Sequence, residues 1–128
     1  MKLKTLLTMF AIFSAVVSIE FLVRPEFWIT LYGATADDQA EFLYRLIGAL
    51  FGGIAVMAWT SRWAEPSTAR NALISGLVTA NVMLAFLAVS GAVAGVYNQF
   101  AWGPAITFGA FAMGFARIQA RTATTVAA

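Results

Sequence analysis

The stretch YRLIGALFGGIAVMAW, residues 44–59, decides the fold of this chain. Arg45 is its only charged residue, and the apolar run that follows continues to Trp59. A helix needs about 20 apolar residues to cross a bilayer, so this run and its flanks predict a membrane-spanning helix over residues 39–60. Within it, Gly48 and Gly52 form a GxxxG motif, which lets a second helix approach closely in lipid.

The composition of the whole chain also indicates a membrane protein. Of its 128 residues, 61% are hydrophobic and 11% are charged, whereas soluble domains have about 25% charged residues. Three more apolar stretches, residues 3–23, 72–96 and 101–118, are long enough to span a bilayer. We therefore predict an all-α, integral membrane four-helix bundle over residues 1–118, followed by a disordered cytoplasmic tail over residues 119–128.

A short segment separates the first two predicted spans. Its sequence, PEFWITLYG at residues 25–33, is aromatic and apolar but too short to cross a membrane. Pro25 and Gly33 interrupt regular structure at its two ends. We expect an interfacial half-helix or turn that lies on the membrane surface.

The charged residues predict the orientation of the spans, because cytoplasmic segment ends carry an excess of Lys and Arg. If the N-terminus is cytoplasmic, so is the C-terminus, and six of the eight basic residues lie on that side: Lys2, Lys4, Arg62, Arg70, Arg117 and Arg121. Five of the six acidic residues lie at or near the other side: Glu20, Glu26, Asp37, Asp38 and Glu41. This asymmetry predicts a multi-pass protein of the plasma membrane with both termini in the cytoplasm.

The chain has no cysteine and no histidine. Disulfides, thiol catalysis, haem ligation by these residues and the usual zinc sites are therefore excluded, and we predict no metal site. The basic residues are scattered over segment ends and form no continuous patch, so we do not expect a nucleic-acid partner.

Two related charged segments, EFLVR at residues 20–24 and EFLYR at residues 41–45, lie near the predicted outer boundary. Glu20 and Arg45 share a depth on consecutive spans, so we predict that they pair across the two helices, with Glu41 assisting. A charge near mid-membrane is costly, and pairing offsets part of that cost. Two interpretations stay open: a structural staple, or an outward-facing polar cavity for an anion, a headgroup or a proton.

Asn81 lies near the middle of the third predicted span, on one face with Ala85, Ala88 and Ala92. A polar residue at this depth is expected to hydrogen-bond to a neighbouring helix, and the alternative is contact with a pore or ligand. Gly91 and Gly95 form a second GxxxG motif near the end of the same span. Both glycine motifs are predicted helix-packing sites, either within the bundle or between copies of the chain.

The order of these features resembles small bacterial four-helix membrane proteins of the DoxX-like kind and related uncharacterised families. In the resembling region, residues 44–116, an arginine opens the glycine-rich second span, and Trp102 opens a fourth span that ends in FAMGFA. The resemblance implies a four-helix inner-membrane bundle. Some DoxX-like proteins are linked to quinone or thiol redox systems. Because this chain has no cysteine, a thiol system is not expected. We predict no cofactor, and the resemblance leaves a quinone as the one alternative.

We expect a non-enzymatic accessory or structural subunit of a membrane assembly, in contact with the lipid bilayer and with either further copies of itself or a larger membrane complex. No group in the sequence predicts catalysis. Two alternatives stay open. One is an oligomeric channel or carrier for a small ion or solute, with Glu20, Arg45 and Asn81 along its path. The other is a quinone-linked, DoxX-like redox component.

Overall fold

A computed structural model describes residues 2–126 of the chain, with side chains as far as residue 120. Its elements are α1 (Leu3–Val23), α2 (Pro25–Leu31), α3 (Asp38–Ser61), α4 (Thr68–Val93), the short 3-10 helix η1 (Gln99–Ala101) and α5 (Trp102–Val126). All regular elements in residues 2–126 are helices, so the all-α prediction is confirmed.

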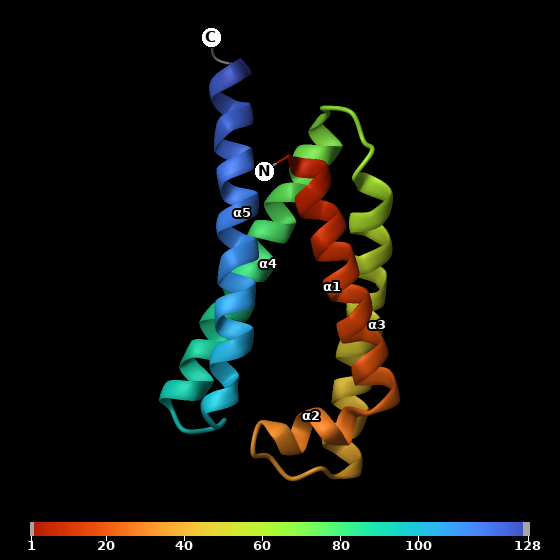
Figure 1. The fold of residues 1–128 in the computed structure, drawn as a ribbon, viewed down its shortest axis with the longest axis vertical. Coiled ribbons are helices and arrows are strands. Elements are labelled where there is room, and N and C mark those ends of the chain that lie inside the picture. Colours follow the sequence, from red (N-terminus) through yellow and green to blue (C-terminus); the bar gives the residue numbers. More distant parts are fainter. Residues whose placement is uncertain (1, 127–128) are drawn as a thin grey trace.

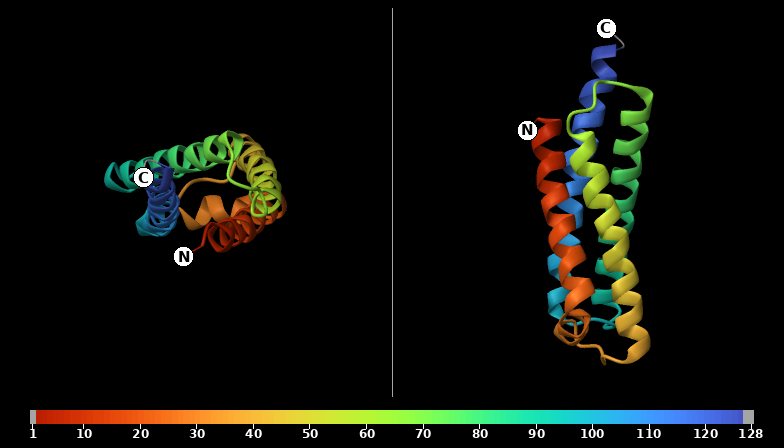
Figure 2. Two further views of the ribbon diagram at one scale, coloured as in Figure 1. Left: turned by 90° about the horizontal axis from the view of Figure 1, so that it is seen from above. Right: turned by 90° about the vertical axis from the view of Figure 1, so that its right-hand side faces the viewer.

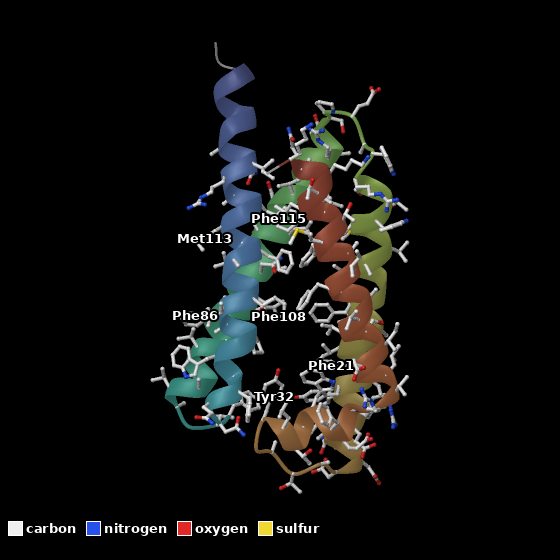
Figure 3. All side chains as sticks on the ribbon, viewed as in Figure 1. Phe21, Tyr32, Phe86, Phe108, Met113 and Phe115 are labelled. Carbon is white, nitrogen blue, oxygen red and sulfur yellow. The ribbon has the colours of Figure 1, made fainter. Side chains whose placement is uncertain are left out.

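Three of these helices, α1, α3 and α4, are long and apolar enough to cross a membrane. The fourth long helix, α5, has an apolar first half, but Arg117, Gln119 and Arg121 make its second half more polar. Large apolar side chains also point away from the molecule: Phe86 and Met113 project outward in Figure 3, with 70% and 58% of their surface exposed. Such outward apolar surface is expected where lipid is the solvent.

The four long helices form two antiparallel pairs, α1 with α3 and α4 with α5 (Figure 1). The pairs come together at the end that holds the N-terminus and the α3–α4 loop, and they diverge toward the opposite end. There α2 lies across the space between them, roughly perpendicular to the long helices, as both views in Figure 2 show. We call these the closed end and the wide end of the molecule.

Local sequence signals explain where the helices begin and end. Asp37 caps α3 by accepting a hydrogen bond at Oδ1 from the backbone N–H of Ala40, at 2.7 Å, as Asp does at helix starts. Just after the C-terminal end of α4, Gly95 adopts a left-handed φ of +70°. The N–H of Val96 then donates to the carbonyl of Gly91 at 3.0 Å, which is the Schellman termination that glycine permits.

Helices α1 and α3 approach each other closely along small residues. A Cβ atom at Gly48 would lie 3.0 Å from Cβ of Phe21 and 3.1 Å from the carbonyl oxygen of Ser18. A Cβ atom at Gly52 would lie 3.0 Å from Oγ of Ser18. Ser18 of α1 therefore sits against the GxxxG motif of α3, which gives the close backbone approach on which association in lipid depends.

Phenylalanine rings join the two helix pairs near the closed end. The ring centre of Phe10 on α1 lies 4.8 Å from that of Phe111 and 5.5 Å from that of Phe115, both on α5 and both edge-on. Phe115 is fully buried. Ile74 and Leu77 of α4 belong to the same buried cluster. The closed-end halves of the long helices are therefore packed together here.

Two sequence expectations need correction. Helix α4 ends at Val93 instead of residue 96, because the Schellman turn at Gly95 terminates it. Helix α5 continues to Val126, so residues 119–126 are helical where we expected a disordered tail; the segment IQARTAT contains good helix formers and no glycine or proline. Residues 127–128 and the side chain of Arg121 lie outside the described part of the chain.

Replacing Gly48 with valine should separate α1 from α3. The added atoms would meet the backbone of Ser18 and the first side-chain carbon of Phe21, and overpacking of this kind costs about 1–3 kcal/mol. We expect a lower thermal unfolding midpoint in detergent. Gly53→Val is the matched control, because a Cβ at Gly53 meets nothing within 4 Å. Equal midpoints for the two variants would contradict the assigned contact.

Candidate functional site

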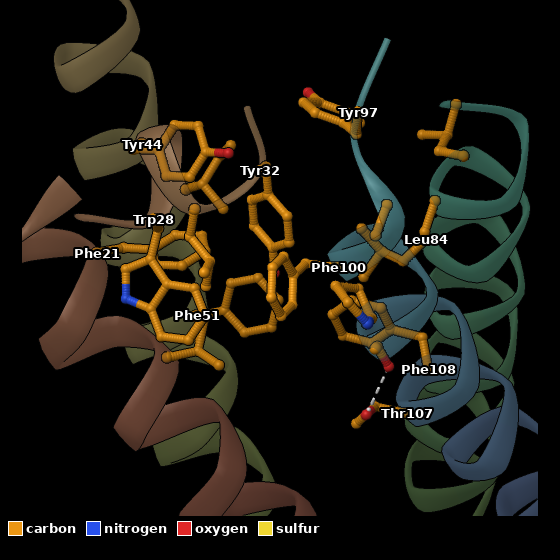
Figure 4. A pocket seen from close by; sticks show the side chains of 18 of the residues that line it. Phe21, Trp28, Tyr32, Tyr44, Phe51, Leu84, Tyr97, Phe100, Thr107 and Phe108 are labelled. Carbon is orange, nitrogen blue, oxygen red and sulfur yellow. Dashed lines mark hydrogen bonds between the residues drawn. The ribbon is translucent and has the colours of Figure 1, made fainter. Parts of the chain in front are cut away.

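A cavity of about 580 Å³ lies between the two helix pairs on the side of α2 (Figure 4). Nine of its nineteen lining residues are aromatic, and all three tyrosines of the chain are among them. From the α1–α3 side it is lined by Phe13, Phe21, Trp28, Tyr32, Tyr44 and Phe51. From the α4–α5 side it is lined by Tyr97, Phe100 and Phe108, with small or apolar residues such as Leu84, Ala88 and Pro104.

Neighbouring rings form a continuous row along the wide end of the cavity. The ring centres of Tyr44 and Phe21 are 4.9 Å apart, and those of Phe21 and Trp28 are 5.9 Å apart. The row continues from Trp28 to Tyr32 at 6.2 Å and from Tyr32 to Tyr97 at 5.9 Å. Because Tyr97 follows α4, the row bridges the two helix pairs.

Phe108 forms part of the opposite boundary, toward the closed end. Its ring centre lies 5.8 Å from that of Phe13 on α1 and 6.2 Å from that of Phe51 on α3. Figure 3 shows Phe108 projecting from α5 toward α1, above the space that Tyr32 faces from α2. The cavity is thus bounded by rings at both ends.

Asn98 fastens the α4–α5 pair to the end of α2. Its Nδ2 donates to the carbonyl oxygen of Leu31 at 2.7 Å, and its backbone N–H donates to the carbonyl of Tyr32 at 3.1 Å. Its Oδ1 meanwhile accepts from the N–H of Phe100 at 3.0 Å, which caps η1. One side chain therefore holds the loop between α4 and η1 and ties it to α2, below the cavity.

The lining offers few polar groups and no charged side chain within the described residues. The hydroxyl of Thr107 is already used, because it donates to the carbonyl of Gly103 at 2.9 Å. The three tyrosine hydroxyls and the indole N–H of Trp28 remain, and this N–H has no hydrogen-bond partner among the described residues. At the wide end of the cavity, burial raises the pKa of Tyr32 above its ordinary value, and the neighbouring Tyr97 adds to this shift. The Tyr32 hydroxyl is therefore a neutral hydrogen-bond donor at physiological pH.

The predicted pairing of Glu20 with Arg45 is not formed. Glu20 instead accepts from Arg24 at 2.6 Å, and Arg45 donates to Glu41 at 3.2 Å, each four residues apart on its own helix. The reason lies in the orientation of α1. Because Ser18 faces α3, Glu20 lies about 200° further round the helix and points away from α3.

Asn81 is buried, with 1% of its surface exposed, but it does not bridge helices as we expected. Its Nδ2 donates to the carbonyl of Leu77, one turn earlier on α4, at 2.8 Å. Its Oδ1 has no hydrogen-bond partner among the described residues. None of the four residues of the predicted polar cluster lines the cavity in the described part of the chain.

The two glycine motifs have different roles. Gly48 and Gly52 contact Ser18 of α1, as described above. On α4, a Cβ atom at Gly91 would lie 2.8 Å from Cδ2 of Tyr97, so the absence of a side chain there makes room for a ring of the cavity. A Cβ atom at Gly95 would have no neighbour within 4 Å. Gly95 instead provides the left-handed backbone conformation that ends α4.

Sequence reasoning overlooked the cavity because it searched for charged and amide groups. A usable signal was the distribution of aromatic residues. Phe13, Val17 and Phe21 recur every four residues on one face of α1, and all three tyrosines lie in the parts of the chain near the wide end. Aromatic rings that are not needed for a helix–helix contact are candidates for a ligand site.

Comparisons with protein-family models, with curated proteins and with solved structures find no match for this chain. The site is therefore interpreted from its own geometry.

Asn98→Asp should loosen α2 while leaving η1 capped. Aspartate keeps the acceptor for the Phe100 N–H but loses the donor to Leu31, at a cost of about 0.5–1.5 kcal/mol for the lost hydrogen bond. We expect faster hydrogen exchange at the backbone amides of Tyr32, Gly33 and Ala34, which are hydrogen-bonded within this turn. Gln99→Glu adds the same charge one residue away and should leave the exchange unchanged. Unaltered exchange in Asn98→Asp would show that Asn98 does not fasten α2.

Proposed function

We propose that this chain is a non-enzymatic integral membrane protein that binds a lipid-soluble, ring-containing molecule in the cavity between its helix pairs. The observation that carries the proposal is the lining: nine aromatic rings surround a space of about 580 Å³. Cavities of about 300–1,000 Å³ with a largely apolar lining are typical of small-molecule sites. Offset and edge-on packing against such rings favours a flat, unsaturated ligand over a flexible chain.

The distribution of charge supports binding over ion conduction. The carboxylates and guanidinium groups of Glu20, Glu41 and Arg45 are engaged within their own helices, away from the cavity. A path for ions needs polar groups or charged rings along it, and the lining supplies mainly hydrocarbon. The channel or carrier alternative therefore has little support at this cavity.

We propose that α5 is a fourth membrane span, so that both termini lie in the cytoplasm of a bacterial cell and α2 lies at the outer surface of the inner membrane. Two features support this arrangement. Helix α5 runs alongside α4, which is itself apolar enough to span (Figure 1). Six of the eight basic residues, all but Arg24 and Arg45, also fall on the closed-end side, as the positive-inside rule requires of a cytoplasmic face.

A reporter fused after Ala128 tests this topology. Alkaline phosphatase, which is active only in the periplasm, should stay inactive, whereas green fluorescent protein at the same position should fluoresce. Alkaline phosphatase at Gly33, between α2 and α3, should be active. Strong phosphatase activity after Ala128 would exclude cytoplasmic termini.

A quinone is a second, narrower candidate ligand. The hydroxyls of Tyr32, Tyr44 and Tyr97 are hydrogen-bond donors at the wide end of the cavity, where they would suit the carbonyl oxygens of a quinone ring. The resemblance of residues 44–116 to DoxX-like proteins adds to this candidate. In this proposal the protein's part is to hold the ring.

Binding can be followed through Trp28, which lines the cavity. In a variant whose other three tryptophans are phenylalanine, 1,4-naphthoquinone should quench Trp28 fluorescence saturably in phosphatidylcholine nanodiscs. Ala88→Phe fills the cavity from α4 and should weaken this binding by about tenfold or more, which corresponds to about 1.4 kcal/mol. Ala80→Phe is the matched control, because Ala80 is exposed on the same helix and does not line the cavity.

Naphthalene separates the two candidate ligands. If the cavity selects rings by shape, naphthalene should displace naphthoquinone at similar concentrations. If it selects quinones, naphthalene should displace poorly, and Tyr44→Phe should weaken naphthoquinone binding. Quenching that is unsaturable, or equal in Ala88→Phe and Ala80→Phe, would refute a binding role for the cavity.

A further inference from the structure

The basic side chains at the two ends of the molecule have different partners. At the wide end, both arginines have a carboxylate partner four residues earlier. At the closed end, Lys4, Arg62 and Arg70 form no ion pair with any residue whose side chain the structure describes. The one acidic residue of that region, Glu65 in the α3–α4 loop, is not paired with them.

Two of these cations lie over the ring of one exposed tryptophan, and the third binds the backbone of the next residue. The Nζ of Lys4, from α1, lies 3.3 Å from the ring centre of Trp63, and the guanidinium carbon of Arg62 lies 5.6 Å from the same ring centre. Arg70, from the first turn of α4, donates through Nη1 to the carbonyl oxygen of Ala64 at 3.2 Å. Three separate parts of the chain thus bring positive charge to residues 63–64.

Stacking on an indole positions a cation without neutralising it. Arg62 lies over the ring of Trp59 at 3.2 Å and also donates to the carbonyl oxygen of Trp59 at 3.1 Å. This arrangement restricts its rotamers, while its remaining N–H groups stay available. A guanidinium group held in this way is well suited to a phosphate, whose oxygens it can bind in pairs.

The surroundings indicate that the phosphate belongs to a lipid. Trp59 and Trp63 are 47% and 65% exposed, and the preceding turn of α3 carries the exposed apolar residues Val56 and Met57. Indoles prefer the headgroup level of a bilayer, where one part of the ring contacts hydrocarbon and another contacts polar groups. A phosphate beside these rings would lie at the depth of lipid headgroups.

We propose that Lys4, Arg62 and Arg70 form a binding site around Trp63 for the headgroup of an anionic phospholipid. The inference is independent of which molecule occupies the aromatic cavity. It differs from general attraction of a basic surface to a membrane, because it requires the cations at Trp63 and not other basic residues at the same end.

The test compares thermal unfolding in two nanodiscs: pure phosphatidylcholine, and equal parts of phosphatidylcholine and phosphatidylglycerol. Phosphatidylglycerol should raise the unfolding midpoint of the wild-type protein. The Lys4→Gln, Arg62→Gln double variant should lose this rise. The matched control is Lys2→Gln with Arg117→Gln, which removes the same charge from residues with no described contact to Trp59 or Trp63, and it should keep the rise.

A charge-conserving double variant, Lys4→Arg with Arg62→Lys, should recover most of the effect, which separates loss of the site from loss of folding. Native mass spectrometry of protein released from the mixed nanodiscs should detect retained phosphatidylglycerol on the wild type and control, but not on Lys4→Gln, Arg62→Gln. Equal loss in both glutamine double variants would overturn the proposal, because it would show that only net charge matters. Equal stabilisation by inorganic phosphate in detergent would overturn the assignment to a lipid.

Discussion

The contact of Ser18 with Gly48 and Gly52 determines how the rest of this structure is arranged. Once α1 and α3 meet along these small residues, the rotation of each helix about its axis is set. Phe21 of α1 and Tyr44 of α3 then turn their rings toward each other at the edge of the cavity. The acidic side of α1 is left facing outward, where Glu20 pairs with Arg24.

The second helix pair is held against the first mainly at its two ends. Near the closed end, the rings of Phe10, Phe111 and Phe115 pack edge-on. At the wide end, the hydrogen bonds of Asn98 and the contact of Tyr32 with Tyr97 join α2 to the α4–α5 pair. The pairs diverge toward the wide end, where α2 lies across the space between them, and the cavity lies between the pairs on that side.

The wide end and the closed end also differ in the partners of their charged side chains. Carboxylates neutralise the arginines at the wide end, whereas indoles position the cations at the closed end and leave their charge available. An apolar, ring-lined cavity and an unneutralised basic rim place two kinds of binding chemistry in one small protein. The first suits a molecule dissolved in the hydrocarbon of a bilayer, and the second suits a bilayer's anionic headgroups.

Much of the fold followed from sequence because its causes are local. Apolar runs of sufficient length predicted helices, and Pro25 and Gly33 bounded a short segment that the structure shows as α2. The partners of Glu20, Arg45 and Asn81 were predicted wrongly for one reason. In each case, depth along the span suggested a partner on another helix, but a group four residues away on the same helix was within reach.

By itself, the sequence determined the class of this protein: a helical chain with segments long and apolar enough to span a membrane, no cysteine or histidine, and six of its eight basic residues on the predicted cytoplasmic side. Hydropathy, composition and charge are properties of single residues and their near neighbours, so no tertiary contact is needed to read them. Only the tertiary structure decided that nine aromatic rings from both helix pairs and their connections surround one cavity, and that Lys4 contacts Trp63. Both depend on how each helix is rotated about its axis, and packing between helices far apart in the chain sets that rotation.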